Sequence, residues 1–467
     1  MENKGILSSK KLIVFIAIIV LLIAILPGQI TNTVPLEISL LFFVIAMFSV
    51  IGIIRELDYA AVTLNMIHWI FTLIFFFVAP LTQASFGFSV WGFNSMDNEN
   101  VTKSCLMIIL WIVVYSLSGS LIGKKIHLPG AKQREKISSG WLYIFTFISL
   151  VCGIMIVSRY GFYNMFSRAD MKASEDAVEM SIAVGLIWSK CSRATIVFTE
   201  TLLIMTAIKK EIKVNKLLFI NSIVLLLSCF PFAVSRNEAG VIYLGLFVVF
   251  FYRDLENFRQ KPWYILCFLG ATVAVFPILN VFRRMSIYNE NLFSALYGMA
   301  SNLQEEYLSS NYDAFSMIEG VRNYVEVADF TYGHQLLGAI FFFVPRSIWA
   351  AKPIGTGAMI AKFQGQLFSN ISCPLIGEGY INFGIFGVVL FAFVFGILCT
   401  ILDRKYWENA PNNQSFSFIK IIYPFLPPCF FFMLRGDLMS SLAYTLAYIV
   451  TFWFLFRISR WHINIGK

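Results

Sequence analysis

Apolar runs of about 20 residues recur along the whole chain and are separated mostly by short polar links. A run of this length crosses the hydrocarbon core of a bilayer as one α-helix, because the helix satisfies its own backbone polar groups there. The alternating ten-residue pattern of a membrane β-barrel is absent from the sequence. The pattern predicts an all-α polytopic membrane protein with twelve spans, near residues 12–27, 35–54, 59–82, 104–123, 139–158, 183–208, 216–234, 238–252, 262–282, 380–402, 417–435 and 438–457.

One connection, residues 283–379, is far longer than the others. It contains an apolar run at 336–349 that is too short to span a bilayer and predicts an interfacial or re-entrant helix. The layout therefore divides into an N-terminal bundle (1–282), a large loop (283–379) and a C-terminal bundle (380–467). Long ordered loops usually carry function.

Charge sets the expected orientation. Twelve spans put both termini on one side, and lysine and arginine gather in links on that side, as at 124–136, 209–216 and 253–261. By the positive-inside rule we expect cytoplasmic termini and a periplasmic large loop in a bacterial inner membrane. Charged residues make up 13% of the chain, against roughly 25% in a soluble domain. Much of the net charge of +9 lies in these links, so we expect no nucleic-acid partner.

Arginine is concentrated on the expected outer face, which carries eight arginines and four lysines, against seven and fifteen on the inner face. The planar guanidinium holds phosphate or carboxylate through two parallel hydrogen bonds. The best-placed candidates are Arg236, in a tight turn before the eighth span, Arg346, beside Pro345, and Arg435, at the outer end of a proline-kinked eleventh span. Three others are expected to be solvated: Arg159, Arg168 and Arg322.

The sixth span carries Lys190, Arg193 and Glu200 on one helix face. Charges inside a membrane cost roughly 2.5–3.5 kcal/mol each on insertion scales, so they should face the bundle or a wet cavity. Arg193 either joins the outer arginines or forms a purely structural ion pair with Glu200. Asn65 and His68, one turn apart in the third span, predict hydrogen bonds between helices.

Two stretches of the chain carry further candidate chemistry. In the first, Arg346, Trp349 and Lys352 follow a proline break. They either anchor an interfacial helix at the headgroups or bind a phosphate. The second, 377–387, is rich in glycine, which allows close backbone approach. Its Glu378 either caps a helix as a solvated carboxylate, or it hydrogen-bonds or deprotonates a sugar hydroxyl.

Several site classes find no support in the sequence. The four histidines show no metal-ligand spacing, so neither a metal site nor a cofactor is expected. The phosphate-cradling glycine loop of nucleotide hydrolases and the nucleophile elbow of serine hydrolases are also missing from the sequence.

At these residues the chain resembles the O-antigen polymerase family, the oligosaccharide repeat-unit polymerases of Wzy type. The resemblance rests on Pro345-Arg346 followed by Trp349 and Lys352-Pro353, and on the 377–387 stretch with Tyr380 and Asn382. It also rests on Tyr312-Asp313 and on the layout of about a dozen spans with one large outer loop before the last few. Ala350-Ala351 stand where the family usually has a proline.

The resemblance implies a metal-independent glycosyltransferase of GT-C-like fold at the periplasmic face. It would transfer a growing glycan from undecaprenyl pyrophosphate to a repeat unit on the same lipid, beside a chain-length regulator and a flippase as candidate partners. Candidate ligands of the pyrophosphate and glycan are Arg346, Arg236, Arg435, Arg193, Lys352, Tyr380 and Asn382. Glu378, or else Asp313 or His334, would orient or deprotonate the acceptor hydroxyl.

Two other functions fit the same layout. An O-antigen ligase would move finished glycan onto another acceptor and shares the donor. A transporter or flippase of lipid-linked oligosaccharide would need charged residues along a pathway open alternately to both faces, whereas the charges here gather near the outer face.

Overall fold

The computed structural model describes residues 9–25, 34–60, 62–92, 97–126, 137–166, 182–209, 213–251, 266, 269–270, 306–408 and 416–459. Within these ranges the chain is helical and forms no β-strand. Eight helices are long and apolar enough to cross a membrane: Leu36–Tyr59, Leu64–Ser85, Asn98–Gly123, Ser139–Tyr160, Trp188–Lys209, Leu375–Trp407, Phe418–Arg435 and Leu438–Ile458. The protein is therefore an all-α protein suited to embedding in a membrane, as the sequence predicted.

These eight helices coincide with eight of the twelve expected spans. Three other expected spans form shorter helices, which are α1 (Ser9–Ile25), α9 (Asn215–Ser228) and a continuous run of α10 (Arg236–Ala239), η5 (Gly240–Leu244) and α11 (Gly245–Phe250). The ninth expected span, 262–282, lies almost wholly outside the described residues.

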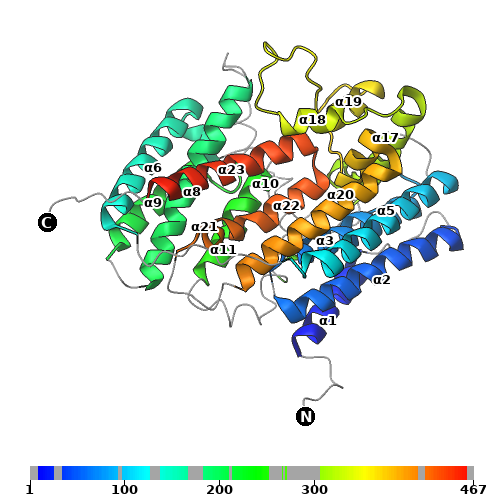
Figure 1. Ribbon diagram of the computed structural model, residues 1–467, viewed down its shortest axis with the longest axis horizontal. Coiled ribbons are helices and arrows are strands. Elements are labelled where there is room, and N and C mark those ends of the chain that lie inside the picture. The colour runs from blue at the N-terminus through cyan, green and yellow to red at the C-terminus, as the bar shows by residue number, and fades with distance from the viewer. Residues whose placement is uncertain are drawn as a thin grey trace.

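The long helices form two packed groups joined by a central layer (Figure 1). One group packs α6, α8 and α9 together, and the other packs α2 against α3 and α5; α20, α22 and α23 lie between them. The bounds are α2 (Leu36–Tyr59), α3 (Leu64–Leu73), α5 (Asn98–Ser118), α6 (Ser139–Tyr160), α8 (Ile182–Lys209), α20 (Leu375–Trp407), α22 (Leu426–Arg435) and α23 (Leu438–Ile458). Large apolar side chains on their outward faces are exposed, among them Phe43, Phe147 and Phe454, as expected for helices that meet lipid.

Several spans change helix type along their length. Three contain π-helical turns, which are η1 (Ile74–Val78) before α4 (Ala79–Ser85), η3 (Gly119–Gly123) and η5. The expected proline kink of the eleventh span is confirmed, because the 3-10 turn η9 (Tyr423–Phe425) interrupts the helix between α21 (Phe418–Ile422) and α22. Short 3-10 turns also form at η2 (Val90–Gly92) and η4 (Tyr163–Phe166).

Helix α20 is broken near its start. Phe383 and Gly384 leave helical geometry, and Gly384 has φ +62°, a conformation that favours glycine. The segment before the break folds back, so a Cβ on Gly387 would collide with the carbonyl of Gly379. The close backbone approach predicted from the glycines is therefore confirmed.

The described part of the large loop forms η8 (Ser310–Tyr312), α17 (Ala314–Ala328), α18 (His334–Ile340) and α19 (Thr356–Phe363). These helices gather at one end of the bundle (Figure 1). The helix expected over 336–349 is shorter than predicted, because α18 ends at Ile340 and turns follow. Pro345 accounts for this, since its ring would clash with the carbonyl of Phe341 in a continued helix.

Candidate functional site

Two arginines from different helices meet at one small cavity beside η8. Its volume is about 20 Å³, room for about one water molecule. The lining side chains come from η1, α10, the segment that includes η8, and α22: Phe75, Arg236, Glu306, Asn311, Tyr312, Phe431 and Arg435. We call this the arginine cavity.

Arg236 is positioned by the start of α10. The Ser235 hydroxyl caps that helix by accepting the backbone N–H of Glu238 at 3.3 Å. Two residues of α8 hold the Glu238 carboxylate. Its Oε2 accepts hydrogen bonds from Lys190 Nζ at 2.5 Å and from Arg193 Nη1 at 3.3 Å. With α10 fixed in this way, Arg236 Nη2 donates to Asn311 Oδ1 at 2.6 Å.

Arg435 is the last residue of α22, and its Nη2 donates to the carbonyl of Ser310 at 2.9 Å and to Asp313 Oδ1 at 3.1 Å. Asp313 is 1% exposed and also accepts Ser372 Oγ at 2.6 Å and Trp91 Nε1 at 3.1 Å. Three donors therefore occupy Asp313, which positions Arg435. Within the described part of the chain, the buried Nε of Arg435 has no hydrogen-bond partner.

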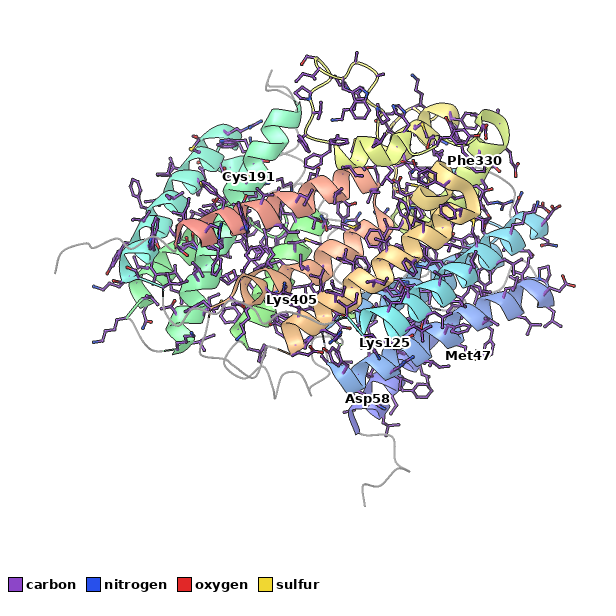
Figure 2. The ribbon with its side chains drawn as sticks, in the orientation of Figure 1. Met47, Asp58, Lys125, Cys191, Phe330 and Lys405 are labelled. Carbon is purple, nitrogen blue, oxygen red and sulfur yellow. The ribbon has the colours of Figure 1, made fainter. Side chains whose placement is uncertain are left out.

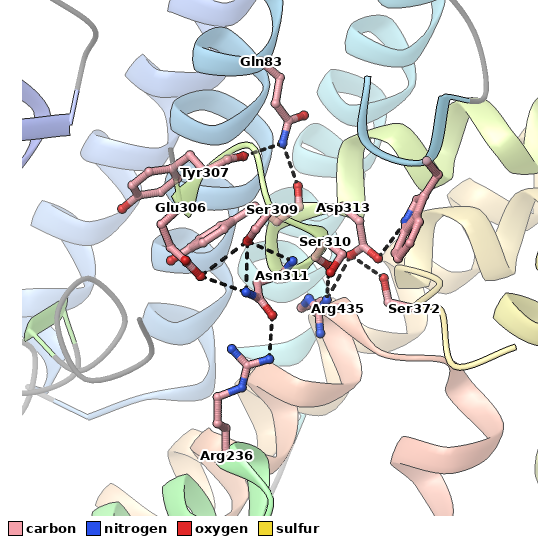
Figure 3. Close-up of polar contacts among 12 residues, drawn as sticks. Gln83, Arg236, Glu306, Tyr307, Ser309, Ser310, Asn311, Asp313, Ser372 and Arg435 are labelled. Carbon is pink, nitrogen blue, oxygen red and sulfur yellow. Dashed lines mark hydrogen bonds and ion pairs between the residues drawn. The ribbon is translucent and has the colours of Figure 1, made fainter. Parts of the chain in front are cut away.

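The segment between the arginines is held by amide side chains (Figure 3). Asn311 Nδ2 donates to Glu306 Oε1 at 2.8 Å, while Gln83 Nε2 donates to the carbonyls of Tyr307 at 2.9 Å and Tyr312 at 3.0 Å. The two tyrosine rings contact each other at an interplanar angle of 35°, with centroids 4.4 Å apart. Burial raises the pKa of both phenols, which keeps them neutral.

A second polar group, the Glu378 cluster (Thr356, Glu378, Asp437, Leu438 and Ser440), joins the start of α20 to that of α23. Glu378 is buried, and its Oε2 accepts Thr356 Oγ1 at 2.7 Å while Oε1 accepts the Leu438 N–H at 2.9 Å. Asp437 caps α23 by accepting the Ser440 N–H at 2.9 Å. Burial raises the pKa of Asp437. The contact with the Leu438 N–H at the start of α23 favours the helix-capping interpretation of Glu378. The expectation that its carboxylate is solvated is wrong, because Glu378 is 2% exposed.

The Arg346 side chain ties its own loop together. Nη1 donates to the carbonyl of Lys352 at 2.5 Å and Nη2 to that of Pro353 at 3.1 Å. Lys352 Nζ in turn donates to the carbonyls of Phe342 at 2.5 Å and Val344 at 3.0 Å. Partial burial, with Arg346 nearby, lowers the pKa of Lys352. Both residues thus contact the outer loop, and neither lines the arginine cavity.

The remaining sequence candidates lie near α18 and the break in α20. His334 is exposed, and its ring centroid lies 6.0 Å from that of Trp349. Asn382 is buried and joins the break to α18, since Nδ2 donates to the carbonyl of Glu378 at 2.8 Å and Oδ1 accepts the Leu336 N–H at 3.1 Å. Tyr380 packs against Phe330, with centroids 6.0 Å apart.

The charges of the sixth span pair differently from one expectation. Arg193 reaches across to Glu238, and Glu200 accepts Asn221 Nδ2 at 2.7 Å and Ser222 Oγ at 2.6 Å. The prediction of an Arg193–Glu200 ion pair is therefore wrong. The two residues lie about 10 Å apart along the helix axis, and each finds a partner on a neighbouring helix.

The interhelical role expected for Asn65 and His68 is confirmed. Asn65 Nδ2 donates to Asp403 Oδ2 at 3.0 Å, and His68 Nε2 accepts Trp111 Nε1 at 3.0 Å.

Two arginines expected to be solvated are not. Arg322 is 5% exposed and donates to the carbonyl of Asn100 at 3.1 Å, because α17 packs on α5 and buries that side. Arg159 is half-buried, with its guanidinium carbon 5.4 Å from the Trp188 ring centre. Arg168 lies outside the described residues.

Sequence reasoning missed Glu306, Asn311 and Glu319. The first two follow no motif, and their importance comes from where the fold places them. Glu319 is 1% exposed, and among the described residues neither carboxyl oxygen has a hydrogen-bond partner. Burial raises its pKa to about 7. The sequence feature that could have indicated Glu319 is its position as a carboxylate within an apolar stretch of α17.

Among the described residues, no group of three or more His, Cys, Asp or Glu side chains is arranged to hold a metal ion. Comparison of the chain with protein-family models, curated proteins and solved structures finds no match. The functional argument therefore depends on the residues and geometry described above.

Proposed function

We propose that this protein is a glycosyltransferase that polymerises oligosaccharide repeat units linked to undecaprenyl pyrophosphate, at the periplasmic face of a bacterial inner membrane. The observation that carries the proposal is the convergence of Arg236 and Arg435 from separate helices on one cavity. Such a pair suits a pyrophosphate, because guanidinium forks match phosphate oxygens. The resemblance to O-antigen polymerases names the class of substrate.

The contacts that the arginines now make support this role. Arg236 donates to the Asn311 amide oxygen, and Arg435 donates to the Ser310 carbonyl. These two acceptors are neutral, although Arg435 also pairs with the Asp313 carboxylate. A phosphate oxygen forms stronger, charge-assisted hydrogen bonds than an amide or carbonyl oxygen. The Nε of Arg435, which has no partner among the described residues, offers one more donor. As the bond between glycan and pyrophosphate breaks, negative charge grows on the leaving group, and arginines fixed in advance stabilise it.

The proposal includes a GT-C-like bundle of about twelve spans with both termini in the cytoplasm. The ends of the helices support this orientation. Lys125 and Lys405 lie at the end of the bundle opposite Phe330 and the outer helices (Figure 2). The positive-inside rule places that lysine end in the cytoplasm. In this arrangement the bilayer, the lipid-linked unit, a flippase that delivers it and a chain-length regulator are the partners.

Arg346 and Lys352 remain proposed contacts of the glycan or of lipid phosphate. Their loop lies at the same end of the bundle as α17 and α18 (Figure 1). Arg346 is exposed on this loop, so an incoming substrate can meet it there.

The gel pattern of surface glycan from a strain that lacks the gene tests the proposal. Single repeat units should replace the ladder, and restoring the gene should restore it. Intact polymer left on its carrier would instead show a ligase, and lipid-linked units trapped in the cytoplasm would show a flippase.

A further inference from the structure

The proposed transfer requires a group that takes a proton from the acceptor hydroxyl, and the residues expected from sequence are poorly placed for it. Both oxygens of Glu378 accept hydrogen bonds from the fold. Asp313 accepts three donors and is buried. His334 is exposed in the outer loop and does not line the arginine cavity.

Glu306 lies where this group is needed. It is half-buried and, among the described residues, is the acidic side chain that lines the cavity together with Arg236 and Arg435. Its Oε1 accepts Asn311 Nδ2 at 2.8 Å and Ser309 Oγ at 3.3 Å. These contacts orient the carboxylate within the cavity.

Asn311 connects the carboxylate to the anion-binding side of the cavity. Its Oδ1 accepts Arg236 Nη2 at 2.6 Å, and its Nδ2 donates to Glu306. One amide therefore fixes Glu306 relative to an arginine, as Figure 3 shows. An anion on Arg236 and a hydroxyl on Glu306 would lie side by side, the arrangement that a transfer between two bound substrates requires.

We propose that Glu306 is the base of the transfer reaction, with Asn311 as a positioning residue; this proposal rests on the proposed function. The acceptor hydroxyl gives its proton to the Glu306 carboxylate, and its oxygen forms a bond to the anomeric carbon of the donor glycan. The bond between that carbon and the pyrophosphate oxygen breaks. Its electron pair stays on the undecaprenyl pyrophosphate, which leaves as an anion held by Arg236 and Arg435.

The informative substitution is Glu306→Gln, which preserves shape and an oxygen that accepts from Asn311 but removes basicity. The purified full-length protein, reconstituted in proteoliposomes, is given lipid-linked single repeat units. We expect the polymerisation rate to fall about 100-fold or more, with the Kd for undecaprenyl pyrophosphate within about twofold of the wild-type value. Glu306→Asp should restore part of the rate.

The pH profile separates a base from a structural residue. The wild-type rate should fall at acid pH, as expected for a reaction that uses a carboxylate base, and Glu306→Gln should lose this dependence. Glu326→Gln is the matched control, because this carboxylate is 63% exposed on α17 and outside the arginine cavity; it should behave as wild type.

Two results would contradict the proposal that Glu306 is the base. One is a Glu306→Gln rate within about twofold of wild type with the same acid limb. The other is a parallel loss of undecaprenyl pyrophosphate binding, which would show that Glu306 builds the cavity. Neither result contradicts the proposed function, provided that the wild-type protein makes polymer. If the wild-type protein binds lipid-linked units but makes none, the proposed function itself fails.

Discussion

The arginine cavity is half-buried and the Glu378 cluster is centred on a buried carboxyl. Both lie at helix ends, yet their polar side chains are satisfied in opposite ways. In the cluster, Glu378 and Asp437 each accept at least two hydrogen bonds from the fold. In the cavity, Arg236 and Arg435 donate partly to neutral oxygens, and the Nε of Arg435 lacks a partner among the described residues. A saturated cluster holds helices together, whereas donors on weak acceptors can take a stronger ligand. The difference favours a structural role for the Glu378 cluster and agrees with the proposal that the arginine cavity binds substrate.

The largest effect should come from the cavity. Arg435→Lys keeps the charge but loses the fork that binds Asp313 and, as proposed, a phosphate. We expect polymerisation to fall about 100- to 1,000-fold, with a thermal midpoint close to wild type. The measurement is polymer formation by reconstituted protein, normalised to folded protein. Arg346→Lys in the outer loop is the comparison: full-length polymer from this variant would exclude a bidentate role for Arg346. Near-normal activity of the Arg435→Lys protein would remove the main support for the proposed function.

The second prediction concerns the Glu378 cluster, and its effect should appear in the free energy of unfolding. Glu378→Ala leaves the Leu438 N–H and the Thr356 hydroxyl without their acceptor, at a cost of about 2–3 kcal/mol for two buried donors that lose their partner. The free energy of unfolding should fall by this amount, while activity per folded molecule changes little. Glu378→Gln, which keeps an acceptor oxygen, should cost less. The opposite pattern, normal stability with lost activity, would move Glu378 into the reaction.

Eight of the twelve expected spans and the two arginines of the cavity could be located from the sequence. Apolar length alone located the helix now seen at Ser139–Tyr160. Arg236, in a tight turn before the eighth span, and Arg435, at the end of the eleventh, were selected because they lie on the side that is expected to be poor in positive charge. Their partners could not be found in this way. Asn311 is 75 residues from Arg236 and Asp313 is 122 from Arg435, so only the packed bundle brings them together.

Burial was the other property that the sequence concealed. Arg322 and Glu319 lie on α17, and a charged residue in a loop is ordinarily solvated. Here α17 packs against both α5 and α20, which buries most of its circumference. Glu378 shows the same limit, since capping and catalysis require the same residue type and only the contacts distinguish them.

Glu319 provides a pH test that involves neither region. Burial, with a smaller contribution from Asp97, raises its pKa from 4.5 to about 7, against the attraction of Arg322. Because the folded-state pKa is the higher one, its contribution to stability is fully present below about pH 4.5 and is lost as the pH rises through 7. The loss should reach about 3 kcal/mol. Glu319→Gln should flatten the unfolding free energy across this window, and exposed Glu326→Gln should leave it unchanged. A wild-type curve that does not fall between pH 4.5 and 7 would contradict the buried neutral acid.

The smallest effect tests the break in α20 that presents Glu378 to its cluster. Gly384 has φ +62°, and a Cβ there would lie 3.0 Å from the Phe330 ring. Gly384→Ala should therefore cost about 1–3 kcal/mol, the penalty of a positive-φ, extended conformation that is essentially restricted to glycine, measured as a lower thermal midpoint. Gly240→Ala is the matched control, since a Cβ there meets open space inside a helix and should be neutral or slightly stabilising. If the cluster is structural and the arginine cavity functional, Gly384→Ala should weaken the fold and leave the Kd for undecaprenyl pyrophosphate unchanged. A raised Kd with unchanged stability would mean that the two regions form a single site.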